Sequence, residues 1–363
     1  PSLPPSLPPS VSVSPRVLSL PRARALSLPL ALSLSTPLPL SLSLPSAADI
    51  FFSLSFLFGA LSLLSYLLPL MLASARGRND LRKRYQAQWA LVTGASSGIG
   101  KELSFALARQ SINVILVALD DPLLSATTAE LAAEFPQLKF RKVGVNLAAA
   151  DGSYMKRIEA ATADVHVSLL FNNAGYMMTG FFHDAPPEKH LANVNCNAIS
   201  ALLITHHFIN RMYASGRPGL VVFTSSAAAY IPSPFTAMYS ATKAFISRFA
   251  TSLAVEARPQ GVDVVAIHPS PVGQTNFLKG TARIQAAEAF YKMSTGPEAL
   301  PPMIFSKLGR GLVLADLGPV AVVMRLLTKL IDDSLFAFGF AFFAPWMPDY
   351  REHASRAGLK GHL

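Results

Sequence analysis

Two residues four positions apart, Tyr239 and Lys243, could form an acid–base pair. They lie in the segment YSATKAFISRFATSLAVEA, whose pattern predicts a helix, and side chains four apart share one helix face. A phenol with an unperturbed pKa of about 10 is a poor acid–base catalyst at neutral pH until a nearby ammonium favours the phenolate. Lys243 can supply that charge, although a Tyr-x-x-x-Lys pair taken alone is usually an ordinary surface pair.

Other polar residues stand at the ends of predicted elements. Ser226 ends the apolar run GLVVFTSS thirteen residues before Tyr239, and its hydroxyl could hydrogen-bond a substrate carbonyl. The sequence Asn172-Asn173-Ala174-Gly175 ends the run VSLLFNNAG, and Asn197 lies at the start of a helix in NVNCNAIS.

A glycine-rich turn follows the predicted strand WALVTG and leads directly into the helical segment KELSFALARQ. It consists of Thr93-Gly94-Ala95-Ser96-Ser97-Gly98-Ile99-Gly100. A phosphate can bind at the N-terminus of such a helix, where free N–H groups and the positive end of the helix dipole face it. Glycines let the backbone approach a pyrophosphate closely, because no Cβ stands between them. The alternative is a plain glycine-rich turn, but the strand before it and the helix after it favour phosphate binding.

Elements that could position these residues alternate along the chain. Apolar runs of strand type are separated by helical stretches such as Lys101–Gln110, and they cover residues 89–94, 113–119, 167–175, 219–226 and 262–269. The runs are apolar throughout, as expected of parallel strands covered by helices on both faces. The sequence therefore predicts an α/β fold with a doubly wound parallel sheet.

The order and spacing of TGxxxGxG, NNAG and Ser-x12-Tyr-x3-Lys resemble those of the short-chain dehydrogenase/reductases, over residues 89–280. The resemblance implies a Rossmann fold and hydride transfer between NAD(P) and a carbonyl. It makes Tyr239 the acid/base, Lys243 the residue that lowers its pKa and holds the nicotinamide ribose, Ser226 the residue that positions the carbonyl, and Asn197 a support for proton relay. It also implies cofactor contacts from Thr93, Gly94, Ser96, Ser97, Gly98, Ile99, Gly100, Asn173, Ala174, Gly175, Tyr239, Lys243, Pro269, Val272 and Thr275.

Within that family, the segment FFHDAPPEKHLANVNCNA and the apolar segment before the domain resemble the endoplasmic-reticulum branch. That branch contains the very-long-chain 3-oxoacyl-CoA reductases and the 17β-hydroxysteroid dehydrogenases. The resemblance implies a long apolar keto substrate and NADPH. A homodimer is compatible with it.

The residues at the end of the second strand leave the cofactor choice open. The resemblance places the acidic marker of NAD enzymes at Ala118 and the arginine marker of NADPH enzymes at Leu119, so both markers are absent. Asp120 and Asp121 follow, and their carboxylates would repel a 2′-phosphate, while that of Asp120 would accept ribose hydroxyls. Asn146 replaces an aspartate that binds the adenine amino group, and an amide oxygen can accept the same bond. NADPH is favoured slightly, on resemblance alone.

The chain begins with two segments of unusual composition. Residues 1–48 repeat Leu, Ser and Pro, and they predict either a targeting peptide or a disordered leader. From Ile50 to Ala75, 26 residues carry no charge, and about 20 apolar residues suffice to span a bilayer. Basic residues follow at once, which places that flank and the catalytic domain in the cytosol.

Charge and cysteine content exclude other functions. Residues 1–88 carry +6 of the net charge of +10, so the basic composition does not indicate a nucleic-acid interface in the folded part. Cys196 is the single cysteine, which excludes an intrachain disulfide. His206 and His207 have no partner at metal spacing, so no metal site is predicted. The segment 334–347, SLFAFGFAFFAPWM, is too short to span a bilayer and is predicted to be either core or a membrane-contacting surface.

These observations divide the chain into a leader (1–48), an anchor (49–75), a basic linker (76–88), a dinucleotide-binding catalytic domain (89–280) and a C-terminal substrate-side segment (281–363). The favoured function is the NAD(P)H-dependent reduction of an apolar ketone such as a 3-oxoacyl-CoA or a steroid. Two alternatives remain: a plastid 3-oxoacyl-acyl-carrier-protein reductase, and a membrane scaffold that binds cofactor without catalysis. The complete set Asn197, Ser226, Tyr239 and Lys243 argues against the scaffold.

Overall fold

The computed structural model describes residues 46–75, 77, 79–275, 277, 284–285 and 292–356. Nearly all of the predicted leader and two arginines of the basic linker, Arg76 and Arg78, lie outside the described residues. The chain divides into two units, Pro1–Phe52 and Ser53–Leu363, with the division inside the first helix. The five-segment division made from the sequence stays a prediction.

A seven-stranded parallel sheet forms the centre of the larger unit, with the strand order β3-β2-β1-β4-β5-β6-β7. Its strands are β1 Trp89–Thr93, β2 Asn113–Ala118, β3 Phe140–Gly144, β4 Val167–Asn172, β5 Gly219–Thr224, β6 Val262–Pro269 and β7 Leu314–Leu317. The predicted doubly wound parallel sheet is therefore confirmed, and so are the five predicted strands. The strands β3 and β7 were not predicted.

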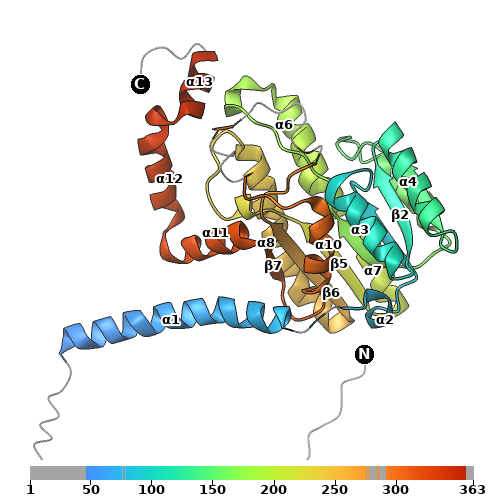
Figure 1. Cartoon of the computed structure of the whole chain (residues 1–363), viewed down its shortest axis with the longest axis horizontal. Coiled ribbons are helices and arrows are strands. Elements are labelled where there is room, and N and C mark those ends of the chain that lie inside the picture. Colours follow the sequence, from blue (N-terminus) through green and yellow to red (C-terminus); the bar gives the residue numbers. More distant parts are fainter. Residues whose placement is uncertain are drawn as a thin grey trace, which may run out of the picture. The chain divides into compact units, whose positions relative to one another are not determined.

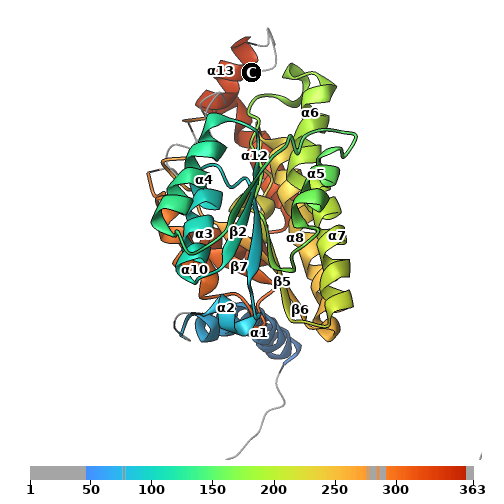
Figure 2. The ribbon, with the colours of Figure 1, turned by 90° about the vertical axis from the view of Figure 1, so that its right-hand side faces the viewer.

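Helices cover both faces of this sheet (Figure 2). The helices are α2 Leu81–Arg84, α3 Gly98–Arg109, α4 Pro122–Glu134, α5 Tyr154–Thr162, α6 Pro187–Val194, α7 Ser200–Ser215, α8 Ala237–Ala257, α10 Leu300–Phe305, α11 Pro319–Leu330, α12 Asp333–Phe343 and α13 Pro348–Arg356. In Figure 2, α3, α4 and α10 lie on one face, and α5, α7 and α8 lie on the other. Figure 1 labels α11, α12 and α13, which continue the chain beyond β7.

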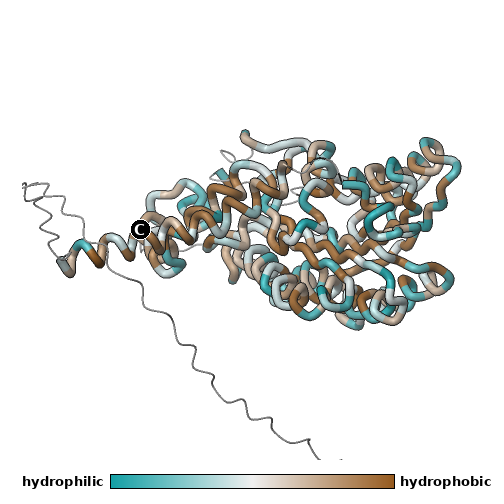
Figure 3. Tube along the Cα trace, turned by 90° about the horizontal axis from the view of Figure 1, so that it is seen from below, coloured by the Kyte–Doolittle hydropathy of each residue, from teal (hydrophilic) through white to brown (hydrophobic). Residues whose placement is uncertain are grey.

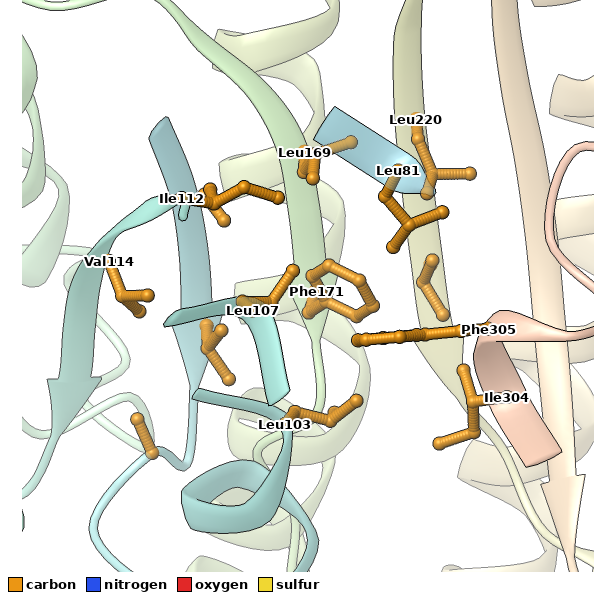
Figure 4. Close-up of a cluster of buried hydrophobic side chains, with 14 of the residues drawn as sticks. Leu81, Leu103, Leu107, Ile112, Val114, Leu169, Phe171, Leu220, Ile304 and Phe305 are labelled. Atoms are coloured by element: carbon orange, nitrogen blue, oxygen red, sulfur yellow. The ribbon is translucent and has the colours of Figure 1, made fainter. Parts of the chain in front are cut away.

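Two buried apolar clusters hold these layers together. Ala90 and Val92 of β1 belong to the cluster under α3, α4 and α10, whereas Leu91 between them belongs to the cluster under α5, α7 and α8. This alternation follows from the period of two along a strand. Figure 4 shows Leu103 and Leu107 of α3 beside Phe171 of β4 in the first cluster. The hydropathy colouring of Figure 3 shows hydrophobic segments in the interior of the trace and hydrophilic residues at many of the outer turns.

The first helix, α1 Ala47–Ser74, has 28 residues and is long and apolar enough to cross a membrane. Its most apolar 18-residue window has a mean hydropathy of 2.0 and is only 6% buried. The last turns of α1 contact the rest of the larger unit. Tyr66 donates its hydroxyl to Asp316 Oδ2 at 2.9 Å, and Arg310 Nη1 donates to the Ala73 carbonyl at 2.7 Å.

The strand order reverses between β1 and β4, because the chain runs outward from β1 to β3 and then crosses back to β4. Loops at the carboxyl ends of these two strands leave in opposite directions and open a crevice between them, where ligands bind in folds of this type. The fold therefore places the glycine-rich turn after β1 and the NNAG segment after β4 at one site.

We expect Leu107→Ala to destabilise the chain by about 2–5 kcal/mol, because it opens a cavity at a fully buried position between α3 and the sheet. The measurement is thermal unfolding of the full-length protein in detergent. Val255→Ala is the matched control: Val255 is 76% exposed, and this change should alter stability by less than about 0.5 kcal/mol. Equal effects of the two changes would contradict the assignment of α3 to the core.

Candidate active site

A cavity of about 1040 Å³ lies at the carboxyl ends of the central strands. Fifteen residues predicted to form the site line it: Gly94, Ser96, Ser97, Gly98, Ile99, Asn146, Asn173, Ala174, Gly175, Ser226, Tyr239, Lys243, Pro269, Val272 and Thr275. Four predicted residues, Thr93, Gly100, Asp120 and Asn197, do not line it. The structure therefore gathers most of the predicted residues around one space and places a few behind its wall.

The turn between β1 and α3 forms one end of the cavity and has room only for glycine at several positions. Gly94 and Gly98 adopt left-handed φ angles of +65° and +55°. A Cβ at Gly100 would lie 2.1 Å from the Gly94 carbonyl oxygen, so no side chain fits there. The amides at the start of the 12-residue helix α3 lie at the end of this turn, in the arrangement that binds a phosphate. These features fit the pyrophosphate of a dinucleotide.

Thr93 supports the cavity wall from inside the sheet. Its hydroxyl oxygen accepts hydrogen bonds from the amides of Asn173 and Ala174, both at 2.9 Å. The Asn173 side chain in turn donates to the Thr93 carbonyl at 3.1 Å and accepts from the Thr224 hydroxyl at 3.1 Å. The ends of β1, β4 and β5 are thereby linked, and the backbone of the NNAG segment is fixed along the cavity.

Lys243 is 3% exposed, and its ammonium donates to the Thr224 carbonyl at 2.7 Å. The same nitrogen lies 5.6 Å from the centre of the Tyr239 ring. Burial lowers the pKa of Lys243 to about 8. Helix α8 carries both residues one turn apart and presents them on one face to the cavity, as the spacing in the sequence indicated.

Ser226 caps the short helix Ala227–Ala229, and its Oγ accepts the Ala228 amide at 3.2 Å. This bond leaves the hydroxyl proton available to a ligand in the cavity that Ser226 lines. The neighbouring Ser225 is turned into the protein, where it donates to the Lys243 carbonyl at 2.8 Å. Both serines line the cavity, but the Ser225 hydroxyl is bonded to α8, whereas the Ser226 hydroxyl can donate to a ligand.

Asn197 lies behind the wall, in a π-helical turn formed by Asn195–Ile199. Its side chain holds the backbone of Tyr176 from both sides, accepting from the amide at 3.0 Å and donating to the carbonyl at 2.9 Å. A Cβ at Gly175 would lie 3.2 Å from Asn197 Oδ1 and equally close to Lys243 Nζ. The Asn197 amide oxygen and the Lys243 ammonium therefore both lie beside Gly175.

The end of β2 differs from the expectation for Asp120. Its carboxylate lies against Gly144 and 3.5 Å from Lys142 Nζ, and it does not line the cavity. The residues that do line it here are Ala118, Leu119, which is 57% exposed, and Asp121, whose carboxylate caps α4 by accepting the Leu124 amide at 2.9 Å. The Asp120 carboxylate points toward Lys142 and away from the cavity, whereas Asp121 keeps a carboxylate at the cavity wall, where it would repel a phosphate.

Asn146 lines the cavity, and its Oδ1 accepts the Ala148 amide at 2.9 Å. Thr275 packs beside the glycine-rich turn, since a Cβ at Gly98 would lie 3.3 Å from its Cγ2. The neighbouring Val272 forms a bridge with Thr295. The segment after β6 therefore packs against the glycine-rich turn at Thr275, and most of 276–291 lies outside the described residues.

A buried polar group near the site was not predicted. Asp316 on β7 accepts the hydroxyl of Tyr230 at 2.6 Å, and burial raises the pKa of this carboxyl. The ring of Tyr230 stacks on His268, whose pKa burial lowers to about 3. The His268 imidazole forms a 2.8 Å hydrogen bond with Ser247, one turn beyond Lys243 on α8. The signal in the sequence that could have indicated this group is His268, a polar residue at the buried end of the strand VDVVAIHP.

The remaining candidates do not form sites. Burial raises the pKa of the Cys196 thiol to about 11, so it is not a reactive thiolate. His207 lies 3.6 Å from Glu159 on the face of the neighbouring helix. In the described part of the chain, no group of three or more His, Cys, Asp or Glu side chains could hold a metal ion.

Comparisons with known proteins agree with this geometry. Residues 88–285 match the family model described as short chain dehydrogenase. A very-long-chain 3-oxoacyl-CoA reductase of Laccaria bicolor is 32% identical over 224 residues, which cover 61% of this chain and 63% of that protein. This chain thus spans less than two thirds of that relative's length.

Solved structures share the fold. A structure described in a study of 7beta-hydroxysteroid dehydrogenase stereoselectivity superposes with a TM-score of 0.62 at 26% identity, covering 72% of this chain and 98% of the other. A short-chain dehydrogenase from Sphingobium yanoikuyae, solved in complex with NADPH, gives a TM-score of 0.58 at 24% identity, covering 67% and 93%.

Tyr239→Phe should lower kcat by about 10²–10⁴-fold, because it removes the proton-transferring hydroxyl and leaves the ring in place. Cofactor affinity, measured by fluorescence titration of the same protein, should stay within about twofold of wild type, since the phenol oxygen is a small part of that site. Retention of more than about a tenth of wild-type turnover would contradict the acid/base assignment.

The lowered pKa of Lys243 predicts a pH-dependent stability of the cofactor-free protein. From pH 8 to 10.5 the folded chain holds Lys243 neutral while the unfolded chain keeps it protonated, so unfolding takes up a proton. The wild-type stability should therefore rise relative to that of Lys243→Met across this window, and the difference should be constant below it. If the melting temperatures of wild type and Lys243→Met follow parallel curves from pH 7 to 10.5, burial does not lower the pKa of Lys243 in the folded protein.

Proposed function

Because the chain belongs to the short-chain dehydrogenase family, we propose that it is an NAD(P)H-dependent reductase of a long apolar ketone, with a 3-oxoacyl-CoA as the favoured substrate. The observation that carries the proposal is the composition of the single cavity shared by Tyr239, Lys243 and Ser226. One end carries the glycine-rich phosphate site. The other end is lined by apolar side chains, including Met177, Met178, Phe181, Phe235, Phe277, Val320, Met324, Phe340 and Met347.

Each residue of the site has a separate role in the proposed carbonyl reduction. A bound nicotinamide supplies the hydride. The Ser226 hydroxyl donates a hydrogen bond to the carbonyl oxygen, and Tyr239 gives that oxygen its proton. Lys243, which is mostly protonated at neutral pH because its pKa is about 8, stabilises the phenolate left on Tyr239. Asn197 holds the backbone at Gly175 and Tyr176, against which the ammonium rests.

The apolar wall and the relatives support a fatty acyl substrate over a compact one. The relative in Laccaria bicolor is named for very-long-chain 3-oxoacyl-CoA reduction. A rim of this cavity also carries Lys189 and His190, which suit the phosphates of a coenzyme A moiety. A steroid ketone is the second candidate, supported by the hydroxysteroid dehydrogenase structure that superposes on this chain.

The helix α1 supports attachment of this enzyme to a membrane, with the basic residues after it on the cytosolic side. The resemblance to the very-long-chain reductases favours the endoplasmic reticulum. A plastid acyl-carrier-protein reductase would need no span of this length, so the apolar helix argues against that alternative.

A substrate panel tests the proposal. Purified full-length protein would be incubated with NADPH or NADH and with 3-oxoacyl-CoA esters of increasing length, a keto-steroid and a 3-oxoacyl-acyl-carrier protein. The expected result is cofactor oxidation that rises in kcat/KM with acyl length and disappears in Tyr239→Phe. Cofactor binding without turnover of any ketone would instead favour the scaffold alternative, and preference for the acyl-carrier thioester would favour the plastid reductase.

For the cofactor, we propose a slight preference for NADPH. Leu119→Arg should raise the affinity for NADPH relative to NADH by about tenfold, because a guanidinium at the cavity wall could pair with the 2′-phosphate. Asp120→Ser is the matched control: its carboxylate lies outside the cavity, so this change should move the ratio much less. Dissociation constants for both cofactors on all three proteins decide the matter. A larger effect at Asp120 would show that its carboxylate turns toward the ribose in solution.

A further inference from the structure

Helix α12 is apolar around its whole circumference, yet none of its residues is buried. After Asp333 and Ser334 its sequence is LFAFGFAFF, and Phe338, Phe342 and Phe343 are between 56% and 68% exposed. Trp346, just beyond its end, is 59% exposed. A helix that is hydrophobic all round is normally enclosed by protein or lipid. With 11 residues, or about 16 Å, α12 is too short to span a bilayer.

The opposite side of α12 faces the active-site cavity. Phe340 and, beyond the helix, Met347 line that cavity, together with Val320 and Met324 of α11. The helix is therefore a wall with the apolar part of the cavity on one side and exposed aromatic rings on the other. A molecule that passes this wall moves from the outer surface directly to the space near Tyr239.

The end of α11 lies beside α1. Lys329 Nζ donates to Ser62 Oγ at 3.4 Å, and α12 begins within a few residues of that lysine, at Asp333. A bilayer takes up about 20 helical residues, and 20 residues counted from Ala47 end at Tyr66. Ser62 then lies about one turn inside the span. Lys329 and Tyr66 at this level are residues of the types that mark a membrane interface.

We propose that α12 lies in the membrane interface, with Phe338, Phe342 and Trp346 among the lipids, and forms the rim over which the apolar substrate passes from the bilayer into the cavity. The membrane placement rests on α1 crossing that same bilayer, and the substrate route rests on the function proposed above. The occupant of the exposed face is a lipid surface rather than a second copy of the chain, because the contact between Lys329 and Ser62 brings α12 to the level where the span ends. Aromatic rings, with an apolar body and in tryptophan a polar edge, suit that level.

The two tryptophans of the sequence allow a direct test of the membrane placement. Trp89 is buried at the start of β1, whereas Trp346 is exposed at the end of α12. Full-length protein would be reconstituted in phosphatidylcholine vesicles with and without bromine atoms on the acyl chains. Bromine should quench the wild-type fluorescence, and in Trp346→Phe the quenching should vanish. Equal fluorescence of the wild type in both kinds of vesicle would overturn the proposal. Cross-linking of α12 to a second copy of the chain would then show that a second copy, and not lipid, covers the exposed face of α12.

A kinetic test addresses the substrate route. Phe338→Gln with Phe342→Gln should raise KM for a long-chain 3-oxoacyl-CoA presented in vesicles by about tenfold while kcat stays unchanged. For a short, water-soluble 3-oxoacyl-CoA, both constants should stay at the wild-type value. Leu191→Gln with Val255→Gln is the matched control: it removes two apolar side chains of similar exposure, 62% and 76%, from α6 and α8, and should change neither KM.

The two tests separate the two proposals. Equal KM changes for long and short substrates, or an equal effect of the control pair, would overturn the substrate route. If the wild type reduces no 3-oxoacyl-CoA while bromine still quenches Trp346, the proposed function is wrong but the membrane placement of α12 is supported.

Discussion

The contact between the ends of β1 and β4 is the constraint on which the rest of the site depends. The Thr93 hydroxyl accepts two backbone amides from the NNAG segment, and Gly94 and Gly100 leave no space for a Cβ. Because the strand order reverses at this contact, the loops on either side diverge and the crevice opens there. A larger residue at Gly100 would separate the strand ends before it reached any ligand.

Hydrogen bonds between neighbouring strands connect that contact to the rest of the site. Asn173 links β4 to Thr224 on β5, and the carbonyl of Thr224 receives the ammonium of Lys243. The position of the Lys243 ammonium is thus set by a backbone carbonyl at the end of a strand, which is less mobile than a side-chain acceptor. This explains how a buried cation with a lowered pKa can be held beside Tyr239: a backbone carbonyl replaces part of the lost hydration.

Much of this could be predicted from the sequence, because the central strands are continuous apolar runs and the site residues follow them at their ends. The strand β3 was missed because FRKVG is partly exposed and carries two charges, and β7 because LADL has only four residues and a buried aspartate. The side-chain direction of Asp120 also depends on packing against Gly144, which no local pattern records. The contacts of Asp316 join segments up to 250 residues apart, so spacing along the chain could not indicate them.

Asp316 links α1 to the segment that follows β5 by hydrogen bonds. Its two carboxylate oxygens accept the hydroxyls of Tyr66 on α1 and Tyr230, four residues after Ser226. Burying a carboxylate is unfavourable unless its lone pairs are satisfied, and the two phenols satisfy them here. If Tyr66 were absent, one buried oxygen would lose its donor next to the turn that carries Ser226. The end of α1, from Tyr66 onward, is therefore part of the folded enzyme, and the roughly 20 residues before Tyr66 belong to a helix that is long and apolar enough to cross a membrane.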